Sequence, residues 1–210
     1  MSNTPKAAPP MRISQNNFGQ TPSQTVGPYF AYGLTAEQYR YRFSQVFDHQ
    51  IALPQAAGEH IRVEGQVLDG NGAPVGDAMV EVLQANAAGQ YVGSLEQAQA
   101  QGFRGFGRCG TGTDAQTRFY FDTVKPGSEG TGHAPHLNVI VTMRGMLLHV
   151  FTRIYFSDET QANAQDAVLC AVPEPRQRTL VAQRQGGPHA AVYRFDIHMQ
   201  GLQETVFFDV

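Results

Sequence analysis

The stretch HLNVIVTMRGMLLHVFTRIYF, residues 136–156, decides the fold. Two runs rich in β-branched and aromatic residues flank a Met-Arg-Gly-Met turn, and the first run alternates apolar with polar side chains. Such a pattern is typical of a β-hairpin. It predicts strands over 136–143 and 147–156, joined at Arg144-Gly145.

Further strands are indicated on both sides of this hairpin. Ile61, Val63 and Val67 alternate with polar residues, as in a strand with one buried face. Similar short runs predict strands at 80–82, 118–124, 191–199 and 204–209. The chain shows no βαβ pattern, GxGxxG motif or P-loop. These features predict a mainly β fold, an antiparallel β-sandwich.

Helical signals are few, so one or two short helices are expected. Thr35 with Gln38 three residues later resembles a capping box and predicts a helix near 35–41. Residues 174–185, between Pro173 and Gly186-Gly187, form the most helical stretch. Residues 98–107 are expected to form a loop. Residues 1–20 are predicted to be a flexible segment, and 21–210 a single domain that includes an N-terminal arm, 21–58.

Composition excludes several classes of protein. Of the 210 residues, 41% are hydrophobic and 16% charged, which suits a packed core rather than disorder. The net charge of -3 and the lack of a Lys/Arg-rich run argue against nucleic-acid binding. No apolar run is long enough for a membrane span, and the N-terminus is unlike a secretory signal. The two cysteines are not spaced as CxxC, and we expect a cytoplasmic protein in which both are buried thiols.

The histidines were considered as metal ligands. A His-x-His pair on a strand would place two imidazoles on one face, but this chain reads His136-Leu137-Asn138. An amide oxygen is a weak ligand for a hard trivalent ion. No Ser-His-Asp or Cys-His arrangement is detectable either. The residues alone therefore predict an incomplete site.

A set of short phrases, in a fixed order, carries a resemblance to a known family. They are TPSQT (21–25), GPY (27–29), GQVLDGNG (65–72), EVLQANAAGQY (81–91), FGR (106–108), VKPG (124–127), APH (134–136), RIYF (153–156), YRFD (193–196) and ETVFFD (204–209). Together they resemble the intradiol ring-cleavage dioxygenases over roughly 21–210. The ending at 204–209 favours the alpha type of chain over the iron-carrying beta type.

This resemblance implies a ferric ion held by two tyrosines and two histidines. One histidine position matches His136, but the other matches Asn138. One tyrosine position matches Ser128, and the loop 92–106, where the other would lie, contains no tyrosine. The resemblance therefore implies no metal and no catalytic residue in this chain, with His136 as a vestigial metal position. Fe(III) would be bound by a partner beta subunit that cleaves protocatechuate with O2 to 3-carboxy-cis,cis-muconate.

The resemblance also implies that this chain lends residues to the partner's substrate pocket. The matching positions are Thr25, Gly27, Pro28 and Tyr29 in the arm and Arg144 at the hairpin tip. An arginine suits this role because its planar fork matches a carboxylate. The arm could equally be a packing strap, and Arg144 an ordinary turn residue. A homomeric catechol dioxygenase and a transthyretin-like binding module are the alternative functions.

Overall fold

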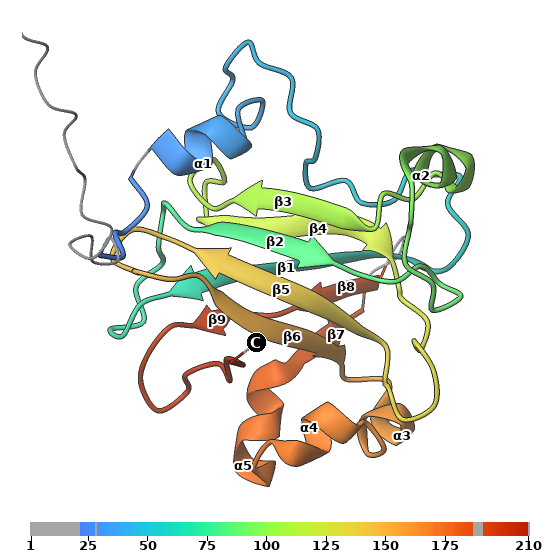
Figure 1. The fold of residues 1–210 in the computed structure, drawn as a ribbon. Coiled ribbons are helices and arrows are strands. Elements are labelled where there is room, and N and C mark those ends of the chain that lie inside the picture. Colours follow the sequence, from blue (N-terminus) through green and yellow to red (C-terminus); the bar gives the residue numbers. More distant parts are fainter. Residues whose placement is uncertain (1–21, 28, 187–190, 210) are drawn as a thin grey trace, which may run out of the picture.

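The computed structural model describes residues 22–27, 29–186 and 191–209; the expected flexible segment 1–20 lies outside them. Strands dominate this part of the chain (Figure 1). They are β1 (His60–Leu68), β2 (Met79–Leu83), β3 (Phe106–Gly110), β4 (Arg118–Val124), β5 (His136–Thr142), β6 (Val150–Phe156), β7 (Val181–Gln185), β8 (Ala191–Arg194) and β9 (Ile197–His198). Five short α-helices accompany them, more than the one or two expected: α1 (Tyr29–Leu34), α2 (Leu95–Gln101), α3 (Thr160–Asn163), α4 (Ala167–Ala171) and α5 (Glu174–Gln177).

The strands pair in the order β3-β2-β5-β6-β7-β8-β1-β4, and β9 pairs with β1. This sheet folds back on itself, so that β3 and β4 lie close together and the core fills the space between the layers (Figure 1). Most pairs are antiparallel, which agrees with the predicted sandwich. The pairs β1–β8, β1–β9 and β6–β7 are parallel. A parallel pair needs a crossover connection, and α3 to α5 supply the one between β6 and β7.

The predicted hairpin is confirmed as β5 and β6. His136 lies opposite Tyr155, and Asn138 lies opposite Arg153. Alternation along β5 buries Val139 and leaves Asn138 partly exposed on the outer face of the sheet. The pairing therefore places the two residues that matter most for a metal site, 136 and 138, at one end of this strand.

The short helix predicted near 35–41 is wrong. The α-helix lies one turn earlier, as α1, and Thr35 follows it. The Thr35 hydroxyl donates 2.7 Å back to the Ala31 carbonyl, so it binds the end of α1 instead of capping a new helix.

The loop predicted at 98–107 is also wrong, because α2 and the start of β3 occupy it. Ser94 caps α2 by accepting a hydrogen bond from the Gln97 N–H, and Gly102 ends the helix with φ 63°.

Three C-terminal predictions are corrected. The helix at 174–185 stops at Gln177, passes through a 3-10 turn (Arg178–Leu180) and becomes β7. Pairing with Tyr155 and Phe156 favours the strand there. The strand at 191–199 is split into β8 and β9, because the Asp196 carboxylate accepts the Gln66 N–H, 2.9 Å, at the break. The strand at 204–209 is reduced to one isolated bridge.

Two further properties of the described residues concern their helices and their cysteines. None of their helices is long and apolar enough to cross a membrane. Cys109 is buried, Cys170 is exposed, contrary to expectation, and both are free thiols. Burial raises the pKa of the Cys109 thiol to about 11, so it stays protonated near neutral pH.

Candidate functional site at the arm, the hairpin tip and the vestigial metal position

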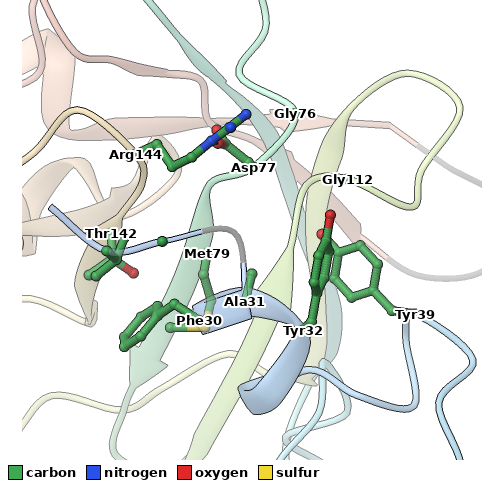
Figure 2. Close-up of a pocket in the computed structure, with 12 residues that line it drawn as sticks. Phe30, Ala31, Tyr32, Tyr39, Gly76, Asp77, Met79, Gly112, Thr142 and Arg144 are labelled. Atoms are coloured by element: carbon green, nitrogen blue, oxygen red, sulfur yellow. The ribbon is translucent and has the colours of Figure 1, made fainter.

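The arm and the tip of the β5–β6 hairpin meet in the structure. The Gly145 N–H donates a hydrogen bond of 2.8 Å to the Thr25 hydroxyl. Beside this contact lies a cavity of about 160 Å³, lined by Gly27, Arg144 and ten other residues (Figure 2). Of the other arm positions, Tyr29 is the first residue of α1, and Pro28 lies outside the described residues. The structure thus brings Thr25, Gly27 and Arg144 together.

Arg144 is held in this cavity by an ion pair with Asp77 (Figure 2). Its side chain is 61% exposed, and the Asp77 carboxylate raises the pKa of the Arg144 guanidinium. These two are the only charged groups among the described lining residues. A carboxylate arriving from outside would therefore compete with Asp77 for a guanidinium that is already positioned at the surface.

The vestigial metal position lies at the other end of β5. The Nδ1 atom of His136 lies 2.8 Å from the Ala134 carbonyl, so this nitrogen carries the proton. Nε2 lies 3.3 Å from a carboxylate oxygen of Glu129. Burial, assisted by the charge of Arg153, lowers the pKa of His136. The ring is therefore neutral near pH 7, with Nδ1 donating to Ala134 and the buried Nε2 left without a hydrogen-bond partner among the described residues.

Asn138 belongs to the same cluster. Its Nδ2 donates to the Tyr91 hydroxyl, 3.0 Å, and that hydroxyl donates to Glu129. Burial and the Glu129 carboxylate raise the pKa of Tyr91, which keeps the phenol protonated. Ser128 uses its hydroxyl on the Gly130 carbonyl, 2.8 Å.

These residues do not fit a ferric ion, which prefers phenolate and neutral imidazole donors. The cluster offers one imidazole, one amide, one protonated phenol and the single carboxylate of Glu129, which already accepts from that phenol. Among the described residues, no group of three or more His, Cys, Asp or Glu side chains is placed to hold a metal. The absence of iron from this chain remains a prediction, and the geometry of His136 and Asn138 favours it.

Sequence reasoning missed four members of this region: Tyr91, Glu129, Arg153 and Asp166. Tyr91 lies directly before the loop 92–106, where the resemblance places a tyrosine ligand, and Glu129 directly follows Ser128. Arg153 could have been found as the residue opposite Asn138 once the hairpin register was set. Asp166 precedes a short apolar run, as an N-cap residue does.

Comparison with known proteins places the chain in a family. A family model described as "Dioxygenase" matches residues 27–201. The protocatechuate 3,4-dioxygenase alpha chain of Burkholderia cepacia is 56% identical over 192 residues, covering 91% of this chain and 98% of that one. The beta chain from the same organism is 36% identical over 165 residues, covering 70% and 67%.

A solved structure agrees in fold. The dioxygenase domain of a carbohydrate-binding fusion protein from Streptomyces sp. SirexAA-E aligns with a TM-score of 0.58 at 18% identity, covering 89% of this chain and all of that one. The chain therefore belongs to the intradiol dioxygenases, a family of iron-dependent enzymes. The resemblance found in the sequence, including its alpha type, is confirmed. A non-enzymatic transthyretin-like module does not agree with this membership.

Proposed function

We propose that this chain is the alpha half of a two-chain protocatechuate 3,4-dioxygenase. A beta-type partner holds the ferric ion and cleaves protocatechuate between its two hydroxyl-bearing carbons. Both atoms of O2 enter the product, 3-carboxy-cis,cis-muconate. The observation that carries the proposal is the cluster of Asn138 and the protonated Tyr91, which does not suit a ferric ion, in a chain that is 56% identical to an alpha chain. The iron, when bound by the partner, activates the catechol for attack by O2.

The described residues support a supplementary role for the arm. Thr25 ties the arm to the hairpin tip, and Gly27 lines the cavity next to Arg144. We propose that Thr25, Gly27, Pro28 and Tyr29 border the partner's substrate pocket. Glycine and proline suit this position because they bring backbone groups close with little side-chain bulk.

Arg144 has the clearest chemical role in this proposal. Its guanidinium is exposed, permanently charged and paired with Asp77, so it can exchange that carboxylate for the carboxylate of protocatechuate. Asp77 thus keeps the arginine extended until substrate arrives. The proposed enzyme is cytoplasmic, where free thiols such as Cys109 and Cys170 remain reduced.

The location of the iron is tested by purifying the chain with and without a beta-type partner. We expect the complex to contain one iron per pair and to consume O2 with protocatechuate. The chain alone should be colourless and free of stoichiometric iron. A tyrosinate charge-transfer band from the isolated chain would contradict the proposal.

The role of the hairpin tip is tested in the complex with Arg144→Ala. We expect KM for protocatechuate to rise severalfold while iron content stays unchanged, because the arginine contacts substrate and not metal. Arg144→Lys should recover part of the loss, since it keeps the charge without the fork. Arg178→Ala, an exposed arginine elsewhere, is the matched control. An unchanged KM in Arg144→Ala would mean that Arg144 is an ordinary turn residue with no contact to the substrate.

A further inference from the structure

A groove of about 350 Å³ lies on the outer face of β2, β5 and β6, the strands that lie side by side in Figure 1. Its floor is mainly apolar, with Leu83, Ile140, Phe151 and Phe208 among the lining residues. The register explains the arrangement: Ile140 lies opposite Phe151, and in the next row Leu83, Asn138 and Arg153 are cross-strand neighbours. An amide and a guanidinium therefore stand side by side at one end of an apolar surface.

The guanidinium of Arg153 has capacity for a further partner. Among the described residues, its side chain donates one hydrogen bond, to the neutral Tyr155 hydroxyl at 3.4 Å, and no carboxylate forms an ion pair with it. By contrast, Arg108 beside the groove is paired with Glu81 at 2.5 Å. A guanidinium that shares a groove with apolar side chains and lacks a carboxylate partner is a preformed site for one.

Asn138 adds a second polar group to the same end of the groove. Its Nδ2 is engaged by Tyr91, which leaves its carbonyl oxygen as an acceptor. The groove thus combines an apolar floor, one cationic fork and one amide acceptor, and among the described lining residues its two carboxylates are Glu81, which is paired with Arg108, and Asp209. These three features match an aromatic ring that carries both a carboxylate and a hydroxyl.

We propose that this groove binds a hydroxylated aromatic monocarboxylate without transforming it. The ring lies on the apolar floor, Arg153 binds the carboxylate, and the Asn138 oxygen accepts from a ring hydroxyl. The neighbouring metal position does not fit iron, so the bound ring is not cleaved. Asp209, which also lines the groove, disfavours ligands with additional carboxylates, including the tricarboxylate product. The ligand class follows from the groove itself and does not depend on the role of the arm.

The proposal is tested by counting binding sites for 3-hydroxybenzoate, whose carboxylate and hydroxyl lie on one side of the ring, on the alpha–beta complex by equilibrium dialysis. This probe has a single ring hydroxyl, so it lacks the adjacent pair between which cleavage occurs. We expect two sites per pair in the wild-type complex, one in the partner and one in this groove. Arg153→Leu should leave one site, whereas the matched control Arg178→Leu should leave two.

A second binding measurement needs no variant of the protein. On the wild-type complex, 3-methylphenol, which keeps the ring and hydroxyl but lacks the carboxylate, should bind the second site roughly tenfold more weakly or worse. One site per pair in the wild type, as would result if the partner covered the groove, overturns the proposal. Two sites in Arg153→Leu overturn it as well. O2 uptake with protocatechuate, measured separately on the wild type, tests the proposed function, so the two can fail independently.

Discussion

Asp166 provides the sharpest test of how the region around the vestigial metal position is held. The side chain is 0% exposed and accepts four hydrogen bonds. One oxygen accepts from the Ala134 N–H at 2.8 Å. The other accepts from the Tyr155 hydroxyl at 2.9 Å and from the first turn of α4, at the Val168 and Leu169 N–H groups, at 3.0 and 2.8 Å. One carboxylate therefore joins Ala134, two residues before β5, to a core tyrosine of β6 and to helix α4.

The cost of removing this carboxylate can be worked out from those contacts. Asp166→Ala loses an N-cap, which is worth about 1 kcal/mol of stability. It also leaves two buried donors, the Ala134 N–H and the Tyr155 hydroxyl, without an acceptor, at about 1 to 3 kcal/mol each. Allowing for relaxation, the total loss of stability is about 3 to 5 kcal/mol. For a chain of this size that lowers Tm by about 6 to 20 °C. Asp166→Asn keeps the cap but presents an NH2 group to the Ala134 N–H, so it should cost about 1 to 3 kcal/mol.

The pH dependence of this effect has a definite sign. Burial raises the pKa of Asp166, but the hydrogen bonds from Leu169, Ala134 and Tyr155 outweigh it and the pKa lies below its usual value. A lowered pKa means that the stabilisation is complete above the unfolded pKa of about 4 and is lost as pH falls through the folded pKa. The stability gap between wild type and Asp166→Asn should therefore narrow below about pH 4.

The assay is thermal unfolding of the alpha–beta complex at fixed concentration, followed by circular dichroism from pH 7 to pH 3. Concentration is fixed because association contributes to the apparent stability. A loss below about 1 kcal/mol in Asp166→Ala would refute the hydrogen-bond reasoning. A stability difference between wild type and Asp166→Asn that stays constant down to pH 3 would refute the assignment of an ionised Asp166 carboxylate in the folded protein.

Two further predictions concern single contacts. A Cβ on Gly65 would lie 1.6 Å from the Phe195 carbonyl oxygen, so Gly65→Ala should cost about 3 kcal/mol of stability or abolish folding. A Cβ on Gly33 would meet nothing within 4 Å, so Gly33→Ala should not destabilise the chain. Urea unfolding compares the stability of the two variants. Tyr91→Phe removes the phenol that joins Asn138 to Glu129 in a partly exposed cluster, so we expect a loss of about 1 kcal/mol, read as a Tm shift of about 2 to 4 °C. An unchanged Tm would mean that the cluster contributes nothing to stability.

The sheet was predictable where burial imposes a period of two on the sequence. The residues of β4 alternate so regularly that Phe119 and Phe121 are buried and Tyr120 is not, and its predicted bounds agree with the structure. α2 was missed because it has no fully buried residue and thus no apolar stripe. At 181–185, pairing of Val181 with Tyr155 overrides the helical character of the sequence. That pairing joins positions far apart in the chain, which local patterns do not record.

The replacement of metal ligands at the candidate site remains a prediction from the order of the motifs, and the sequence did not indicate how the residues there are arranged. Asn138 and Ser128 could be identified from the order of the motifs. The contact between Tyr91 and Glu129 joins residues 38 positions apart through two loops, and no spacing rule anticipates it. Likewise, Arg144 was expected at the hairpin tip, but its ion pair with Asp77 depends on how β2 lies beside β5.

The replacement of metal ligands that the resemblance implies at 128 and 138 has a consequence for charge. A ferric site concentrates positive charge among anionic phenolates, and loss of the ion alone would leave buried polar groups without partners, which is costly in a low-dielectric interior. In this chain Tyr91 is a protonated phenol that donates to Glu129, and the nearby positive charge belongs to Arg153. His136 is neutral, and its buried Nε2 is the one ring nitrogen there without a hydrogen-bond partner among the described residues. A guanidinium cannot activate O2, but it remains attractive to a carboxylate. The implied replacement of the ligands therefore removes the ability to activate O2 at this position. It keeps a positive charge there, on Arg153, that would attract an aromatic acid.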